Sequence, residues 1–161
     1  MWRKAISWLL VLLWMGLIFY LSHQPAVESA NLSSGIMERI LVLIDRVIVG
    51  LKIDPDHFHF IIRKSAHFFA YFILGILVIN ALKTSRMMSL RSIFIGLAIC
   101  VLFAISDEVH QLFVPGRAGQ VMDVVIDTTG AIAGICGYLG LEKLLRDWVL
   151  QLKKASVCYR T

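Results

Sequence analysis

Four apolar runs, separated by segments that carry nearly all of the charge, constrain the fold of this chain more than any other feature. The runs cover residues 5–21, 66–82, 92–106 and 124–141. Each is slightly shorter than the ~20 residues of helix that cross a hydrocarbon core, so each helix is expected to extend into its polar flanks. The predicted spans are about 5–22, 65–83, 90–107 and 123–142, within a single domain covering residues 1–161.

The composition favours an all-α integral membrane protein built as a bundle of four transmembrane helices. The chain is 58% hydrophobic and 17% charged, whereas soluble domains are about half apolar and about a quarter charged. The net charge of +5 comes from basic residues spread through the connecting segments, without the stripe that would favour nucleic acid as a partner. The 3 cysteines predict neither a disulfide framework nor a zinc site.

The distribution of Lys and Arg predicts that both termini lie in the cytoplasm. Two basic residues and no acidic ones precede the first run, and three basic residues and no acidic ones lie at 83–91. The tail after Leu141 has five basic residues against two acidic ones. By contrast, 22–65 has five of each, and 107–123 has one basic residue against three acidic ones. Because cytoplasmic loops are enriched in Lys and Arg, 107–123 is expected outside.

Two segments near the N-terminus have alternative interpretations. Arg3 and Lys4 before the first run are compatible with a secretory signal. The cleavage pattern after that run is weak and Pro25 interrupts it, so a retained anchor is expected. In the first loop, residues 35–52 place their charges on one side of a helix. They predict an extra amphipathic helix on the outer leaflet or across the bundle.

Polar side chains recur at the predicted outer end of the second and third spans. In "RKSAHFFAY", Arg63, His67 and Tyr71 are four residues apart and therefore share one helix face. The third span ends in "SDEVHQ", where an aspartate lies three and four residues before a histidine and a glutamine. These three side chains can point the same way.

The connection between the third and fourth spans also carries polar groups. "VPGR" places Pro115 and Gly116 at the central positions of a type II turn, which would hold Arg117 near the carboxylates. Asp123 and Asp127 then lie one turn apart at the start of the fourth span. In that span, Gly130, Gly134 and Gly137 with Ala133 form a small-residue face that permits close helix contact.

Polar groups within a span usually face the bundle interior or a water-filled cavity, so we infer one polar pocket opening to the outer leaflet. The candidate residues are Ser22, Gln24, Arg63, Lys64, His67, Tyr71, Asp107, Glu108, His110, Gln111, Arg117, Asp123 and Asp127.

Several of these residues have simpler interpretations. Arg63 and Lys64 can contact lipid phosphates at the interface, and Asp123 can cap the start of the fourth helix. Glu108 lies ~100° around a helix from Asp107, so we expect one of that pair to face elsewhere.

The order of these motifs resembles the VanZ-like family of small bacterial membrane proteins. The matching pieces are "LSHQP", "RKSAHFFAY" and "SDEVHQLFVPGRAGQVMDVVIDTTGAIAG". By this resemblance, the recurrent polar positions of the family are His67, Tyr71, Asp107, Glu108, Gln111, Arg117 and Asp123. Asp127 stands where members often carry Asn. The resemblance implies the bacterial cytoplasmic membrane and an association with resistance to the glycopeptide teicoplanin.

Three hypotheses of function follow. In the first, the pocket binds an anionic envelope lipid or a lipid-linked precursor and contributes to teicoplanin resistance. Its ligand-binding residues would be Arg63, Lys64, Tyr71, His110, Gln111, Arg117, Asp127, Ser22 and Gln24. In the second, the protein is a membrane-embedded hydrolase or transferase acting on a phosphorylated lipid. Its catalytic residues would be Asp107, Glu108, His67 and Asp123.

The third hypothesis is a structural partner of another membrane protein, with the glycine face and the amphipathic segment as contact surfaces. A divalent cation is compatible with the first two hypotheses and required by neither. Its ligands would be Asp107, Glu108, His110 and Asp123. None of these hypotheses specifies an oligomeric state.

Overall fold

The computed structural model describes residues 2–24, 55–85 and 90–158, with side chains over 2–24, 60–85 and 90–152. These residues form the helices α1 (Trp2–Ser22), α3 (Pro55–Thr84), α4 (Leu90–Gln111) and α5 (Val121–Cys158). The described residues contain no strand, and the 4 helices are long and apolar enough to cross a membrane. The predicted all-α, multi-pass fold is therefore confirmed. The amphipathic helix expected at 35–52 lies outside the described residues.

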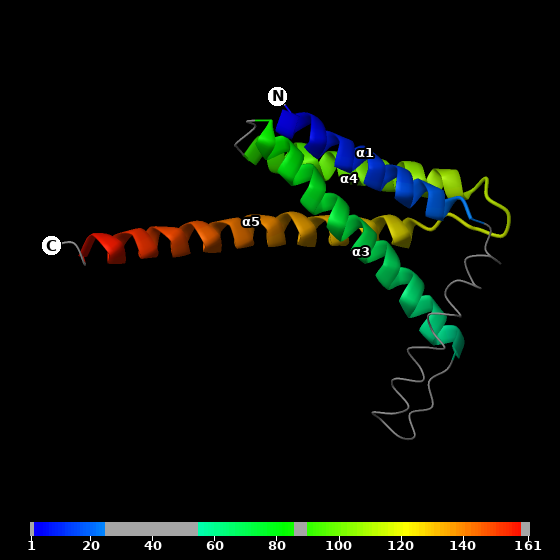
Figure 1. Cartoon of the computed structure of the whole chain (residues 1–161). Helices are drawn as coiled ribbons and strands as arrows, with labels where there is room; N and C mark the ends of the chain where they lie inside the picture. Colours follow the sequence, from blue (N-terminus) through cyan, green and yellow to red (C-terminus); the bar gives the residue numbers. More distant parts are fainter. Residues whose placement is uncertain (1, 25–54, 86–89, 159–161) are drawn as a thin grey trace, which may run out of the picture.

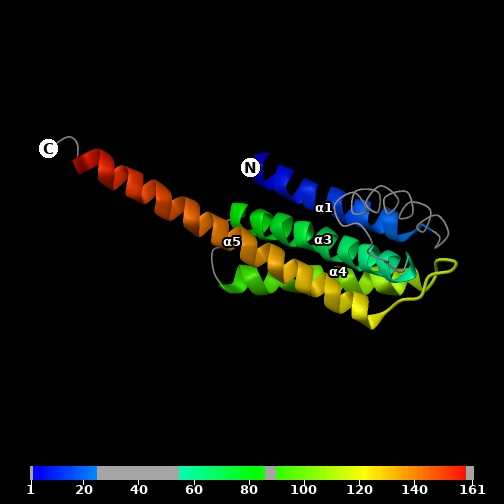
Figure 2. The same cartoon turned by 90° about the horizontal axis from the view of Figure 1, so that it is seen from below.

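Two helices are longer than the spans expected from the sequence. Helix α3 begins at Pro55, a residue whose fixed φ suits the first turn of a helix. Helix α5 continues far past residue 142 because the tail contains good helix formers and neither Gly nor Pro over 142–158. Its apolar segment Val121–Leu152 has 32 residues, more than the ~20 needed to cross the hydrocarbon core. Figures 1 and 2 show the C-terminal half of α5 projecting away from the other helices.

Helix α3 is the central element, since its contacts with the three other helices are the most extensive in the bundle. On the α1 side, the indole N–H of Trp14 donates to the carbonyl of Ala70 at 2.9 Å, and that of Trp8 donates to the Ser85 hydroxyl at 3.2 Å. The bonds join α1 to the C-terminal half of α3, and the two helices diverge toward the start of α3 (Figure 1).

The contact between α3 and α5 is the most extensive of the bundle. It depends on glycines that let the two backbones approach closely. A Cβ atom on Gly130 or Gly134 would collide with the carbonyl oxygens of Phe68 and Phe72, respectively. The small-residue face predicted on α5 is therefore confirmed at these two positions. At Gly137 an added Cβ would lie 3.9 Å from a ring carbon of Phe72, an ordinary contact.

Burial in this bundle is inverted relative to a water-soluble protein. Asp107, Asp123 and Asp127 are exposed by no more than 1%, while Phe94 and Leu102 are exposed by 71% and 67%. Lipid can cover the apolar surface, whereas the carboxylates need partners inside the bundle. The helices alternate in direction, so these carboxylates all lie at the end where α1 and α4 finish and α3 and α5 begin.

Candidate functional site

The α4–α5 connection forms the predicted turn and attaches it to α1. Gly116 has φ 74°, and the Arg117 N–H donates to the Val114 carbonyl at 3.1 Å, as a type II turn requires. The Arg117 guanidinium donates from Nε to the carbonyl of Gln24 at 2.9 Å and from Nη2 to that of Leu21 at 3.4 Å. It thereby satisfies carbonyls at the C-terminus of α1. Burial lowers the pKa of Arg117 from its ordinary value, but the side chain remains cationic at neutral pH.

A hydrogen-bond chain joins α1 to α4 beside this turn. The Gln111 Nε2 donates to the Ser22 hydroxyl at 2.8 Å, and this hydroxyl is 3.0 Å from Asp107 Oδ2. The same Nε2 lies 3.4 Å from Asp107 Oδ2 and 3.3 Å from Glu108 Oε1. One buried amide nitrogen is thus the hydrogen-bond donor to two carboxylates.

The expectation that one of Asp107 and Glu108 faces elsewhere is wrong, because both are buried within the bundle. Helix α4 is bordered by α1 on one side and by α5 with its preceding loop on the other. Asp107 therefore meets Ser22 of α1. The Glu108 Oε2 accepts from the backbone N–H of Gln120 at 2.8 Å, just before α5. A separation of ~100° around the helix leaves both side chains inside the bundle.

Two ionic pairs link α3 to α5 at the same level. Lys64 pairs with the buried Asp123, and its ammonium also donates to Gln120 Oε1 at 3.0 Å. One turn further along each helix, His67 Nδ1 lies 3.3 Å from Asp127 Oδ1. This distance is within the range of an ion pair, although the two groups are not aligned for a hydrogen bond.

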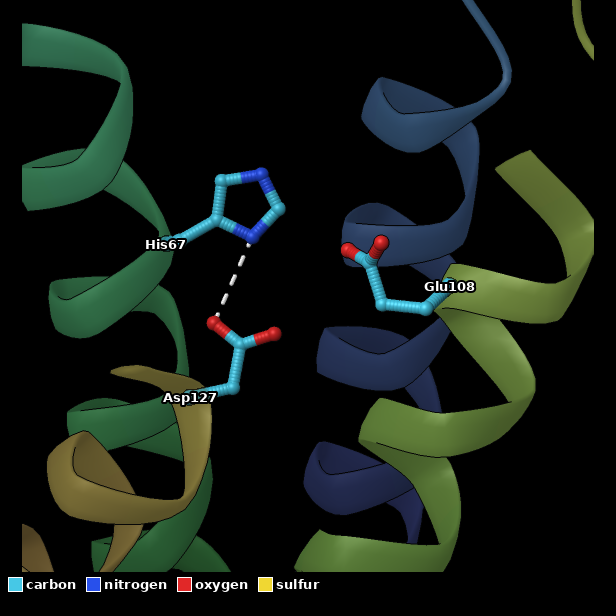
Figure 3. A group of neighbouring side chains, drawn as sticks. All are labelled: His67, Glu108 and Asp127. Atoms are coloured by element: carbon cyan, nitrogen blue, oxygen red, sulfur yellow. Dashed lines mark ion pairs between the residues drawn. The ribbon is translucent and has the colours of Figure 1, made fainter. Parts of the chain in front are cut away.

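The side chains of His67, Glu108 and Asp127 turn toward one another from α3, α4 and α5 (Figure 3). One ligand atom from each lies within 4.8 Å of the others. We define the polar cluster as these three residues and the neighbouring residues that share their end of the bundle. The neighbours are Ser22, Lys64, Tyr71, Asp107, Gln111 and Asp123.

Most members of the polar cluster retain polar atoms without a hydrogen-bond partner. Over the part of the chain with described side chains, the buried atoms of this kind are Arg63 Nη2, Tyr71 OH, Asp107 Oδ1, Gln111 Oε1, Asp123 Oδ2 and both carboxylate oxygens of Asp127. All belong to the cluster or adjoin it. Each unmet group costs roughly 1–3 kcal/mol of folding free energy. The arrangement is therefore typical of a site that takes a ligand, an ion or water.

The remaining predicted residues lie at the edge of the cluster. His110 turns toward α1, where its Nε2 is 3.1 Å from His23 Nδ1 and its ring stacks on Phe19 at 4.1 Å. Although His110 was predicted as a cation ligand, it does not belong to the group of His67, Glu108 and Asp127, because its ring turns toward α1. Gln24 takes part through its backbone carbonyl.

Sequence reasoning missed Gln120, which contacts both Lys64 and Glu108. Its position three residues before Asp123, at the start of α5, is the signal that could have identified it. The N–H of Asp123 donates to the Gln120 carbonyl at 2.8 Å, as at a helix start.

Comparison with known proteins identifies one family. A family model described as VanZ/LLP1 matches residues 7–145. No curated protein and no solved structure matches the chain.

Proposed function

Since the chain belongs to the VanZ/LLP1 family of membrane proteins, we propose that its polar cluster binds the phosphate-bearing head group of an anionic envelope lipid or a lipid-linked precursor. One observation carries the proposal. Buried polar atoms without partners converge from α3, α4 and α5 beside basic side chains at one end of the bundle.

The basic side chains supply phosphate recognition at the rim of the cluster. Arg63 has a buried Nη2 without a hydrogen-bond partner, and Lys64 is attached to the cluster through Asp123. Arg117 lies within electrostatic range of Arg63. Charge-assisted hydrogen bonds from Arg and Lys to phosphate are short and about twice as strong as neutral ones. A phosphate would therefore satisfy Arg63 and offset the mutual repulsion of the neighbouring cations.

The surface next to the cluster suits the hydrophobic part of a lipid. Phe113, Val121 and Met122 flank the α4–α5 connection and are exposed by 80%, 84% and 61%. Apolar side chains at a membrane boundary contact acyl or polyprenyl chains at no desolvation cost. A ligand with both a phosphate and a long hydrocarbon chain matches the two adjoining surfaces.

The distribution of charge favours one orientation of the bundle in the membrane. The Lys and Arg distribution favours a cytoplasmic position for both termini, and in that orientation the polar cluster would lie at the outer leaflet of the bacterial cytoplasmic membrane. A lipid-linked precursor exposed at that leaflet would be within reach of the cluster. Binding it there is the route by which this protein would contribute to teicoplanin resistance.

The proposal is tested by lipid retention. Protein in nanodiscs that contain a polyprenyl phosphate is analysed by native mass spectrometry, with the neutral polyprenol as the reference lipid. Arg63→Gln removes a charged donor and is expected to reduce retention of the phosphorylated lipid about tenfold or more. Lys143→Gln, on the exposed far part of α5, is the matched control and should retain it normally. Equal retention of both lipids by the unaltered protein would contradict the proposal.

Hydrolysis of the phosphorylated lipid is a second candidate function, favoured by the pairing of His67 with Asp127 beside Glu108. A carboxylate-oriented histidine can act as a general base. Water would attack phosphorus, its proton would pass to His67, the bond from phosphorus to the lipid oxygen would break, and that oxygen would take up a proton. Release of inorganic phosphate, abolished by His67→Gln with lipid retention unchanged, would establish this activity. Retention of the lipid without release of phosphate would show that the protein binds the lipid and does not hydrolyse it.

A further inference from the structure

Three side chains from three helices form a set of candidate metal ligands. The nearest ligand atoms of His67, Glu108 and Asp127 lie within 4.8 Å of one another. Atoms bound to one cation at ~2.0–2.6 Å are at most about 5 Å apart, so small side-chain rotations bring all three onto a common ion. Figure 3 shows that the three side chains already turn toward one another.

Unmet oxygens at the same place independently indicate a ligand. Asp127 is fully buried, and neither of its carboxylate oxygens has a hydrogen bond among the described residues. The hydroxyl of Tyr71, one turn from His67 on α3, is also buried without a partner. This hydroxyl lies within electrostatic range of Asp127 and Glu108. An oxygen-binding cation, or a water bound to one, would satisfy these atoms together.

The charge balance of the interior favours a cation. Asp123 is paired with Lys64, and Asp107 accepts from Ser22 and Gln111. Glu108 and Asp127 contribute two further carboxylates, and the histidine at 3.3 Å is the only basic side chain that contacts Asp127 among the described residues. Buried like charges without compensation are strongly unfavourable. A doubly charged cation between them removes this repulsion.

We propose that His67, Glu108 and Asp127 bind one divalent cation of the Mn²⁺ or Zn²⁺ class. Imidazole nitrogen favours transition metals over Mg²⁺ and Ca²⁺, and two carboxylates are compatible with Mn²⁺ and Zn²⁺. Asp107, the residue before Glu108 on α4, and the Tyr71 hydroxyl would orient water at the ion. With three protein ligands the ion keeps open positions, as in metal sites that act on substrates.

The cation site stands on these contacts and does not depend on the lipid proposal. If both hold, an open position of the ion would be available to a phosphate oxygen of the lipid. Metal binding can be measured without any lipid ligand, and lipid retention can be measured in the presence of a chelator. The two proposals therefore fail separately.

The test uses the full chain in detergent, freed of metal with a chelator and then titrated with Mn²⁺ or Zn²⁺ alone. Equilibrium dialysis with elemental analysis is expected to give one ion per chain. His67→Gln and Asp127→Asn should each weaken binding at least about tenfold. Pulsed electron paramagnetic resonance of the bound Mn²⁺ should show coupling to an imidazole nitrogen that disappears in His67→Gln.

His110→Gln is the matched control, because His110 lies at the same end of the bundle and pairs with His23 instead. It should leave the stoichiometry, the affinity and the nitrogen coupling unchanged. Loss of binding in His110→Gln with retention in His67→Gln would place the ion at the paired histidines and overturn the proposal. Absence of binding by the unaltered protein would overturn it as well. The spectroscopic signal of the unaltered protein decides the question if a variant fails to fold.

Discussion

At the scale of single residues, Gln111 is the side chain on which the buried carboxylates most directly depend. Its Nε2 faces Ser22, Asp107 and Glu108 at 2.8, 3.4 and 3.3 Å, and the residue is fully buried. Gln111→Leu keeps the approximate volume and removes the shared donor. We expect a loss of about 1–3 kcal/mol in unfolding free energy, measured as a lower melting temperature in detergent. Gln151→Leu, on the exposed end of α5, makes the same chemical change and should leave the melting temperature unaltered.

The membership of the polar cluster could be predicted residue by residue, but its pairings could not. Spacing on each helix identified His67, Asp107, Gln111 and Asp127. The spacing of residues predicts which side chains share a face of one helix. It does not predict how the neighbouring helices are rotated, and therefore which side chains meet. The side chain of His110 shows the consequence, since it belongs to the predicted face of α4 yet packs on α1.

At the scale of helices, the α3–α5 contact depends on two glycines of α5. A Cβ on Gly134 would meet the backbone oxygen of Phe72, which cannot rotate away as a side chain would. Gly134→Ala is therefore expected to separate the helices and to cost about 1–3 kcal/mol of stability. Because His67 and Asp127 lie on these helices, it should also weaken ligand or metal binding. Thermal unfolding and metal titration measure the two effects.

Two other glycines of the same helix provide the control for this prediction. An added Cβ at Gly137 makes only an ordinary contact at 3.9 Å, and at Gly140 it meets nothing within 4 Å. Gly140→Ala should leave stability unchanged or raise it by up to about 1 kcal/mol, through helix propensity. Equal destabilisation by Gly134→Ala and Gly140→Ala would show that the close approach is unimportant.

The helices themselves were the most predictable part of the structure, and their ends the least. Apolar runs and the Pro-Gly turn signal predicted the spans and the α4–α5 hairpin. The glycine spacing predicted a close contact on α5 without identifying α3 as the partner. The extension of α5 was missed because hydropathy falls at Glu142, while helix propensity continues through the charged residues that follow.

At the scale of the whole molecule, the two ends of the bundle differ in charge, and this difference predicts an orientation in the membrane that can be tested. The N-terminus of α1, the C-terminus of α3 and the N-terminus of α4 lie at one end, opposite the α4–α5 turn (Figures 1 and 2). The former end carries the excess of Lys and Arg, so it is expected in the cytoplasm. In intact cells, Ala118→Cys, in the exposed α4–α5 connection, should react with a membrane-impermeant maleimide. Gln151→Cys, on the projecting part of α5, should react only after permeabilisation, with the unaltered chain reporting the background of the native cysteines. The reverse pattern would move the polar cluster to the inner leaflet and exclude lipid-linked precursors at the outer leaflet as its ligands.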